Sequence, residues 1–532
     1  MAAKLILLLG FFACMVAVGI YARRSAQDVN GFVLGGRSVG PWLTAFAYGT
    51  SYFSAVVFVG YAGQFGWKYG LSATWIGIGN ALIGSLLAWV LLGRRTRVMT
   101  HHLEAATMPE FFGKRYDSDK LKIVASAIIF IFLVPYTASI YNGLSRLFAM
   151  AFDVPYVACV LVMAILTGGY VILGGYMATA INDFIQGIIM LVGIIAVIAA
   201  VLSGQGGFYH AIHELALFTS DAPVTAGQAG AFTSFFGPDP WNLLGVILLT
   251  SLGTWGLPQM VHKFYAIKDE KSINTGTVIS TLFAIIIAGG SYFLGGFGRL
   301  FDTAAIYNGQ GGIVYDAIIP AMLSTLPDIL IGVVVVLVLS ASMSTLSSLV
   351  LTSSSTLTLD FLRGTVMKDM TEKTQLFLIR ILIVFFIALS VVLALDPPTF
   401  IAQLMGISWG ALAGAFLAPF FYGLYWKSVT AASVWVCFAF AILLTVSNIF
   451  LKFIPSSIVA GAIAMLAGLV IVPLVSVFTA KPDAAKVAAV FSCYEEQVLV
   501  PQNRSLVIDS AEEEESKQHV HAPSAAAISE MA

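Results

Sequence analysis

Apolar residues occur along the chain in runs of about 20, separated by shorter polar connections. An α-helix needs about 20 apolar residues to cross a bilayer, so each run predicts a transmembrane helix. A β-barrel would show alternating segments of about ten residues instead. The pattern therefore predicts an all-α polytopic membrane protein with about thirteen spans. We expect them near residues 3–21, 41–64, 71–93, 121–150, 154–174, 181–203, 240–262, 275–298, 328–358, 376–395, 399–425, 429–450 and 455–479.

Composition supports a chain that is dissolved in lipid. Of the 532 residues, 59% are hydrophobic and 10% are charged, whereas soluble domains carry about 25% charged residues. The net charge is −1 and no part of the chain forms a basic domain, so membrane lipid is an expected partner and nucleic acid is not. The four cysteines include no CxxC spacing, which argues against a thiolate metal site.

Lysine and arginine are unevenly distributed between alternate connections of these spans. Cytoplasmic connections of membrane proteins carry an excess of these residues. One set of connections holds Arg23, Arg24, Arg37, Arg94, Arg95, Arg97, Lys114, Arg115, Lys120, Lys122, Lys263, Lys268, Lys271, Arg363, Lys368, Lys373 and Lys427, and the opposite set holds only Lys4, Lys68, Arg299 and Lys452. The bias predicts a multi-pass cell-membrane protein with its N-terminus outside and its C-terminus in the cytoplasm.

Enzymatic chemistry finds little support in the sequence. No GxxxxGK[ST] loop is present, so nothing indicates ATP hydrolysis. All seven histidines fall in connections, at span ends or in the tail, whereas redox work inside the membrane needs histidine within a span. His210 and His213 are spaced to touch one metal, although two solvated loop histidines are the simpler interpretation. We predict that the chain is not an enzyme.

The densest group of polar residues inside a predicted span covers residues 340–348 of the ninth span, SASMSTLSS. On a helix, positions 341, 344, 345 and 348 share one face. Small hard cations prefer oxygen ligands, and uncharged hydroxyls with freed carbonyls suit Na⁺. The alternative is that these hydroxyls bond the carbonyls of their own helix or hold helices together.

Two other spans contain residues that favour a break in the helix. Residues 49–54, GTSYFS, lie within the second span, and residues 253–259, GTWGLPQ, lie within the seventh. Glycine and small polar residues let a helix unwind where it lines a cavity, and proline frees a carbonyl one turn back. A break in the seventh span would put Thr254 and Trp255 beside a cavity, whereas an ordinary proline kink is the alternative.

Asp183 lies near the cytoplasmic end of the sixth span. A carboxylate within a span costs about 2.5–3.5 kcal/mol on insertion scales and usually has a function. An N-cap role, with Gln186 three residues later, is an equally good interpretation.

These segments together resemble the sodium/solute symporter family, which includes proline, pantothenate, sialic acid and sugar symporters. The resemblance covers about residues 5–480 and is strongest at 174–178, 182–186, 256–259, 263–264 and 342–348. It implies two inverted five-helix repeats with broken helices. We therefore divide the chain into a first helix and linker (1–40), a transport core (41–425, with repeats at about 41–203 and 240–425), two peripheral helices (426–479) and a disordered cytoplasmic tail (480–532).

The resemblance also implies where sodium binds. Carried over by position, the ligands of one site are the carbonyls of Thr50, Phe53 and Ala341 and the hydroxyls of Ser344 and Thr345. Some members have a second site, which here corresponds to Asp183, Ser347 and Ser348. Na⁺ is thus the expected coupling ion.

The solute is less clearly indicated. Tyr136 resembles a tyrosine in the fourth helix of proline symporters, but Tyr52 stands where they have aspartate. Thr250 and Thr254 stand where they have tryptophan and tyrosine. We expect a small organic solute, such as an amino acid or carboxylate, bound beside Ser54, Tyr136, Thr254 and Trp255.

The hypothesis is Na⁺-coupled import by alternating access. A membrane sensor with a transporter core is an alternative, although the tail holds no signalling domain. A passive channel would need a continuous polar pore. Proton coupling through Asp183 is a further alternative. The sequence does not indicate the oligomeric state.

Overall fold

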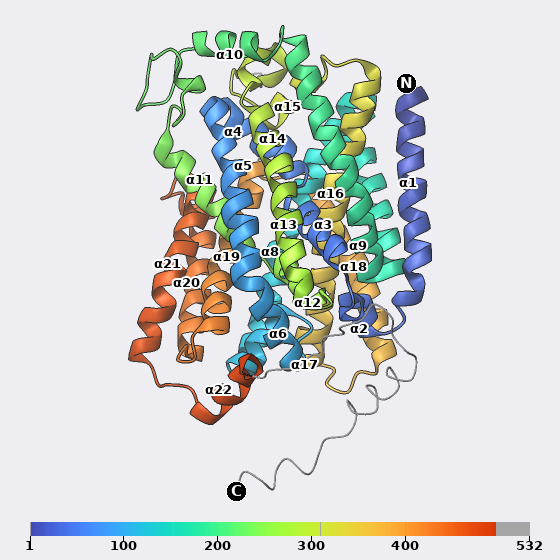
Figure 1. Cartoon of the computed structure of the whole chain (residues 1–532), viewed down its shortest axis with the longest axis vertical. Coiled ribbons are helices and arrows are strands. Elements are labelled where there is room, and N and C mark those ends of the chain that lie inside the picture. The colour runs from blue at the N-terminus through green and yellow to red at the C-terminus, as the bar shows by residue number, and fades with distance from the viewer. Residues whose placement is uncertain (1, 153, 309, 400, 496–532) are drawn as a thin grey trace, which may run out of the picture. The chain divides into compact units, whose positions relative to one another are not determined.

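Helices form almost all of the regular structure in the computed structural model, which describes residues 2–152, 154–308, 310–399 and 401–495. Contacts divide the chain into two units, Met1–Tyr494 and Glu495–Ala532, and the first is described below. No strand is formed among the described residues. The expected all-α class is therefore confirmed (Figure 1).

The helices follow the predicted apolar runs closely. The principal ones are α1 (Ala2–Ala22), α2 (Val29–Leu34), α3 (Pro41–Tyr52), α4 (Ala62–Tyr69), α5 (Thr74–Gly79), α6 (Arg94–His102), α7 (Met108–Arg115), α8 (Asp119–Phe152), α9 (Tyr156–Gly204), α10 (Phe208–Leu217), α11 (Pro240–Leu252), α12 (Pro258–Ala266), α13 (Lys271–Ala284), α14 (Gly290–Gly295), α15 (Tyr315–Leu323), α16 (Asp328–Thr356), α17 (Arg363–Thr365), α18 (Glu372–Leu395), α19 (Ile401–Tyr425), α20 (Ala431–Leu451), α21 (Ser457–Phe478) and α22 (Ala484–Phe491).

Ten helical stretches of the described chain are long and apolar enough to span a membrane. The number rises to eleven if two helices that meet at a bend are counted together as one span. Two of the ten, Val56–His102 and Tyr156–Gly204, have 47 and 49 residues, about twice the length that one crossing needs. Gly70 and Gly175 lie inside them with φ of +60° and +54°, a region that favours glycine. Each stretch is long enough for two crossings, and the count of thirteen stays a prediction.

Both predicted helix breaks are present. α3 ends at Tyr52, Phe53 and Ser54 are not helical, and the chain resumes in a π-helical segment at Val56–Tyr61 before α4. In the seventh predicted span, Pro240–Trp255 and Pro258–Ala266 meet at 40°. Gly256 and Leu257 separate them, so the span is broken rather than merely kinked.

α16 is the most deeply buried polar helix. Every residue from Leu337 to Thr356 is buried, and the helix packs against α1, α3, α8 and α9. Its serines and threonines therefore face protein rather than lipid. The polar run of residues 340–348 lies beside the break after α3.

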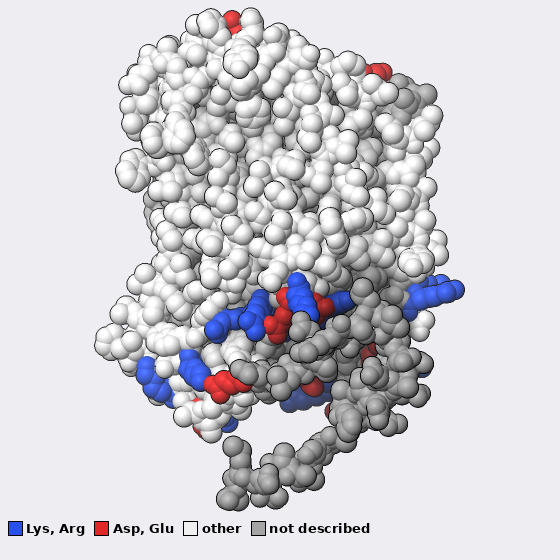
Figure 2. All heavy atoms as spheres, viewed as in Figure 1, with Lys and Arg blue, Asp and Glu red and all other residues white. Residues whose placement is uncertain are grey.

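Charged side chains gather at one end of the bundle. On the face drawn in Figure 2, Lys and Arg cluster at the end that carries α6, α17 and α22 in Figure 1, while the opposite end shows none of them. Lys263 departs from the pattern that the sequence predicted. It is buried within α12 instead of lying in a connection.

The first part of the predicted disordered tail is a helix. α22 buries Val487 and Phe491, and the Lys486 ammonium lies 2.6 Å from the Asp117 carboxylate. The Tyr494 hydroxyl donates to the Arg95 carbonyl at 3.1 Å. A short amphipathic helix thus docks at the charged end of the bundle, which differs from the prediction. Residues 496–532 lie outside the described residues.

Candidate sodium and solute site

The break after α3 faces hydroxyl groups of α16. The Ser344 hydroxyl donates to the Thr50 carbonyl at 2.9 Å and to the Ala341 carbonyl at 3.1 Å. The Thr345 hydroxyl lies 3.2 Å from the Thr50 carbonyl, 3.4 Å from the Ser51 carbonyl and 3.1 Å from the Ala341 carbonyl. Four predicted sodium ligands therefore meet at one point between two helices.

The sequence also allowed these hydroxyls to bond only the carbonyls of their own helix, and this holds only in part. Ser344 and Thr345 do reach carbonyls of their own helix, but both also reach across to α3. The Thr50 carbonyl is available because α3 ends two residues later, while the Thr50 hydroxyl bonds the Phe46 carbonyl at 2.8 Å. Uncharged oxygens in this arrangement suit a hard cation, so the residues present fit Na⁺.

Phe53 extends the same group of oxygens. It follows the last residue of α3 and has extended backbone angles, φ −109° and ψ +101°. Its carbonyl therefore lies outside the helical ladder. Across the break, the backbone N–H of Ala55 donates to the Ser342 hydroxyl at 3.3 Å. The unwound segment is held to α16 on both sides.

The second predicted ion site has a different arrangement. Asp183 lies inside α9, two turns beyond Gly175, and is fully buried; it is not an N-cap. The Ser347 hydroxyl donates to the Ser344 carbonyl of its own helix at 2.8 Å. The Ser348 hydroxyl lies 2.8 Å from the Ser51 hydroxyl.

Lys263 reaches this second site from α12. Its ammonium nitrogen lies 2.9 Å from the Ser348 hydroxyl and 3.6 Å from the Asp183 carboxylate. It also lies 5.2 Å from the centre of the Tyr176 ring. The structure thus brings together Asp183 and Ser348 through a buried lysine.

Two of the predicted solute-binding residues, Ser54 and Tyr136, lie beside a packed aromatic group that includes Tyr52. Tyr52 stacks on Phe53 with ring centres 4.3 Å apart and on Trp409 at 6.1 Å. Tyr136 packs edge-on against the other side of this group, 6.0 Å from Trp409. Among the described residues, the buried Tyr136 hydroxyl makes no hydrogen bond of normal geometry, although the Trp409 and Ser54 side chains lie close enough to interact with it. Ser54 follows Phe53 directly and is also buried.

Thr254 and Trp255 face the helix that contains Asn80–Leu87. The Thr254 hydroxyl donates to the Gly84 carbonyl and the Trp255 indole N–H to the Ile83 carbonyl, each at 3.0 Å. The Tyr52 hydroxyl donates nearby to the Thr250 carbonyl at 2.5 Å. The helix break therefore does not expose Thr254 and Trp255 to a cavity in this structure.

The centre of the bundle is closed to a solute. The gap beside Phe53, Ser54 and Ala341 has a volume of about 10 Å³, the space that one water molecule needs. Leu337 and Met190 complete its apolar wall. Solute binding here requires the surrounding helices to move.

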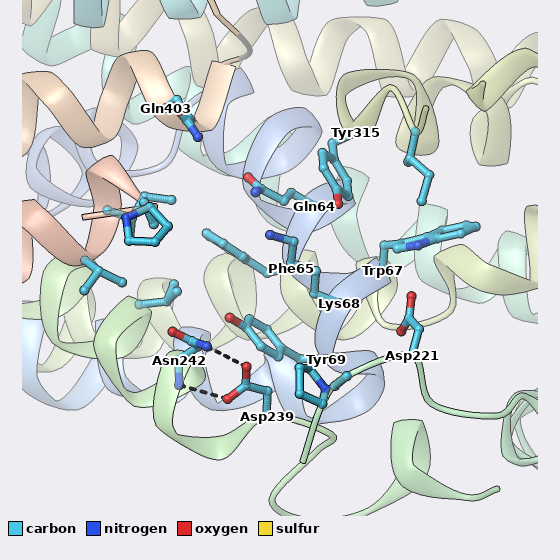
Figure 3. Close-up of a pocket in the computed structure, with 18 of the residues that line it drawn as sticks. Gln64, Phe65, Trp67, Lys68, Tyr69, Asp221, Asp239, Asn242, Tyr315 and Gln403 are labelled. Atoms are coloured by element: carbon cyan, nitrogen blue, oxygen red, sulfur yellow. Dashed lines mark hydrogen bonds between the residues drawn. The ribbon is translucent and has the colours of Figure 1, made fainter. Parts of the chain in front are cut away.

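A larger polar cavity opens at the end of the bundle opposite α22. Its volume is about 550 Å³, and Figure 3 shows Gln64, Lys68 and Tyr315 around it. Arg299 closes one side, because its guanidinium donates to the Trp67 carbonyl at 2.8 Å and to Asp221 at 2.9 Å. We refer to this cavity as the vestibule.

Sequence reasoning passed over two residues of this region. Trp409 lies in a mostly apolar run whose few polar residues, such as Gln403 and Ser408, form no dense group. Lys263 lies five residues after Pro258, close to the predicted span end, and was counted with the connections. The family resemblance at 263–264 links it to the seventh span, whereas the charge pattern puts it in a connection, and the structure buries it within α12.

Sequence comparisons place the chain among known transporters. The sodium:solute symporter family model matches residues 32–434. The osmoregulated proline transporter OpuE of Bacillus subtilis (strain 168) is 30% identical over 435 residues, 80% of this chain and 85% of OpuE. The sodium/proline symporter of Staphylococcus aureus (strain JH9) is 28% identical over 442 residues, 79% of this chain and 81% of that protein.

Two solved structures share the fold. A Na⁺-coupled sialic acid symporter in a substrate-bound, outward-open state matches with a TM-score of 0.72 and 16% identity, covering 90% of this chain and 98% of that one. Mhp1, a nucleobase-cation-symport-1 family transporter, matches with a TM-score of 0.50 and 14% identity, covering 86% and 97%. The chain therefore belongs to the sodium:solute symporter family, and Na⁺ is its coupling ion.

Proposed function

We propose that the chain imports a small organic solute, an amino acid or a carboxylate, together with Na⁺. The observation that carries this proposal is the meeting of the Ser344 and Thr345 hydroxyls with the Thr50 carbonyl at the broken end of α3. Relatives that are named as proline transporters make proline the first solute to test. The departures at Tyr52 and Thr254 make a wider panel necessary.

Sodium would act by holding α3 to α16. Thr50, Phe53 and Ala341 would supply carbonyl oxygens, and Ser344 and Thr345 would supply hydroxyl oxygens. Each hydroxyl now donates to a carbonyl, so an entering cation replaces these hydrogen bonds with contacts to all the oxygens at once. Coupling then requires that Na⁺ bind the solute-ready state more tightly than the others.

The solute would enter through the vestibule and bind beside the unwound segment. The gap of about 10 Å³ beside Phe53 and Ser54 is too small for it, and Tyr52, Trp409 and Tyr136 are packed on one another, so both regions would have to open to admit it. Ser54 and Tyr136 would then face the solute with polar groups. Thr254 and Trp255 would join them only if their bonds to Gly84 and Ile83 break.

The positive end of the bundle would face the cytoplasm of a cell membrane, by the same rule that applies to the sequence. α22 and α6 lie at that end. The N-terminus and the vestibule would then face outwards, which suits a carrier that imports its solute.

Uptake into proteoliposomes tests the function directly. With radiolabelled proline as the probe, and unlabelled amino acids and carboxylates as competitors, we expect accumulation under an inward Na⁺ gradient and none when K⁺ replaces Na⁺. One charge moved across 100 mV contributes about 2.3 kcal/mol, enough to drive accumulation. Accumulation that a pH gradient alone drives would contradict sodium coupling.

Replacing both hydroxyls of the sodium site should weaken Na⁺ binding. A hydrogen-bond-like contact to a charged group contributes about 1.5–3 kcal/mol. The variant Ser344→Ala/Thr345→Ala should therefore need at least about tenfold more Na⁺ for half-maximal uptake. Ser355→Ala is the matched control, because its buried hydroxyl bonds only the Thr352 carbonyl of the same helix. An unchanged sodium requirement would remove both hydroxyls from the site.

Tyr136→Phe tests the solute site separately from the ion site. Its hydroxyl makes no hydrogen bond of normal geometry among the described residues, and a net hydrogen bond contributes about 0.5–1.5 kcal/mol. We expect the KM for solute to rise about two- to tenfold while the Na⁺ requirement stays constant. Tyr422→Phe, whose hydroxyl bonds the Leu469 carbonyl at the periphery, should change neither value. A KM equal to that of the unmodified protein would exclude contact with the solute.

Orientation can be measured by cysteine labelling in a variant without the four native cysteines. Tyr209 and Val366 are 86% and 73% exposed and lie near opposite ends of the bundle. In whole cells, a membrane-impermeant maleimide should label Tyr209→Cys and spare Val366→Cys, which should react only after the cells are opened. The reverse pattern would contradict the proposed orientation.

A further inference from the structure

Lys263 is a buried cation that faces only one carboxylate. Its side chain is 2% exposed and that of Asp183 is 0% exposed. The ammonium nitrogen lies 3.6 Å from the carboxylate and 2.9 Å from the Ser348 hydroxyl, with the Tyr176 ring on another side at 5.2 Å. Among the described residues, no other carboxylate lies within ion-pair distance of this nitrogen.

These contacts match what a bound cation would make. Asp183 supplies charge, Ser348 supplies a hydroxyl oxygen, and Tyr176 presents the face of its ring, which attracts cations. The family resemblance implies a sodium ion between Asp183, Ser347 and Ser348 in some members. Here a nitrogen of the chain itself fills that position, and the Ser347 hydroxyl is turned to the Ser344 carbonyl. The residues present therefore do not fit a second Na⁺.

Charge reinforces this conclusion. Asp183 and Lys263 together are neutral, and burial makes an unpaired charge costly. A sodium ion entering beside the ammonium would put two cations on one carboxylate, away from water. Loss of the ammonium alone would leave the Asp183 carboxylate buried without its ion-pair partner.

We propose that Lys263 is a tethered cation that replaces a second coupling ion, so that this symporter binds one Na⁺ per chain. The inference rests on the proposed function, because it takes Thr50, Ala341, Ser344 and Thr345 as the single sodium site. It adds to the proposed function that one Na⁺ binds per chain and that Lys263 is the residue that limits the number to one.

The Lys263 side chain also links the two broken spans, the one that contains α3 and the one that contains α12, without a bound ion. Lys263 extends from α12, Asp183 belongs to α9 and Ser348 belongs to α16, and Ser348 bonds Ser51 of α3 at 2.8 Å. A cation that is part of the chain holds these helices at any sodium concentration. Sodium dependence then comes only from the site at Thr50.

The test counts sodium ions on purified full-length protein with ²²Na⁺ as the probe and no solute. We expect about one ion per unmodified chain. Lys263→Ala should bind about two, because the freed Asp183 and Ser348 then hold a sodium ion. Lys263→Ala/Asp183→Asn should return to one, since the carboxylate that holds the second ion is gone. Lys268→Ala is the matched control: its side chain is 57% exposed, and its count should equal that of the unmodified protein.

The outcomes separate this inference from the proposed function. Two ions on the unmodified chain would overturn the tethered cation while leaving sodium coupling intact. One ion on Lys263→Ala, in a variant that Na⁺ still protects against thermal unfolding, would also overturn it. No specific sodium binding to the unmodified chain would instead overturn the proposed function. If Lys263→Ala does not fold, Lys263→Met, which keeps the length of the side chain and removes its charge, is counted instead; it should bind about two ions, and a count of one would overturn the inference.

Discussion

The need to pair every polar group in the absence of water governs this structure. A helix in lipid satisfies its own backbone, so a break within a span leaves carbonyls that some other element must satisfy. The break at Phe53 and Ser54 is tolerated because α16 presents hydroxyls and not apolar side chains at that level. The same pairing that makes the break possible creates a cluster of uncharged oxygens, and that cluster suits a sodium ion.

Buried charged groups must also be paired, and one such pair lies at the next turn of α16. Asp183 is buried on α9, where an unpaired carboxylate would be costly. Lys263 supplies a cation from α12, the second half of the other broken helix. α16 is therefore tied to α3 by hydroxyl-to-carbonyl hydrogen bonds and to α12 by a hydrogen bond from a buried, ion-paired lysine. Our proposal of one exchangeable cation rests on this difference.

Packing at the centre explains why a carrier rather than a channel results. Tyr52, Trp409 and Tyr136 fill the space beside the unwound segment, while a vestibule of about 550 Å³ lies beyond them. The gap beside Phe53 and Ala341 holds only about 10 Å³, and the three aromatic side chains are themselves buried.

The length of the apolar runs by itself determined the helical class and the membrane, and the placement of glycine, proline and small polar residues indicated two helix breaks, with a proline kink left as the alternative in the seventh span. The sequence also indicated the hydroxyl-rich face of α16. Only the tertiary structure decided which oxygens meet, since Thr50 and Ser344 are brought together by helix packing. It alone placed Lys263 between Asp183 and Ser348, turned Thr254 and Trp255 towards Gly84 and Ile83, and docked α22. These outcomes depend on contacts between distant segments, which no local pattern of residues encodes.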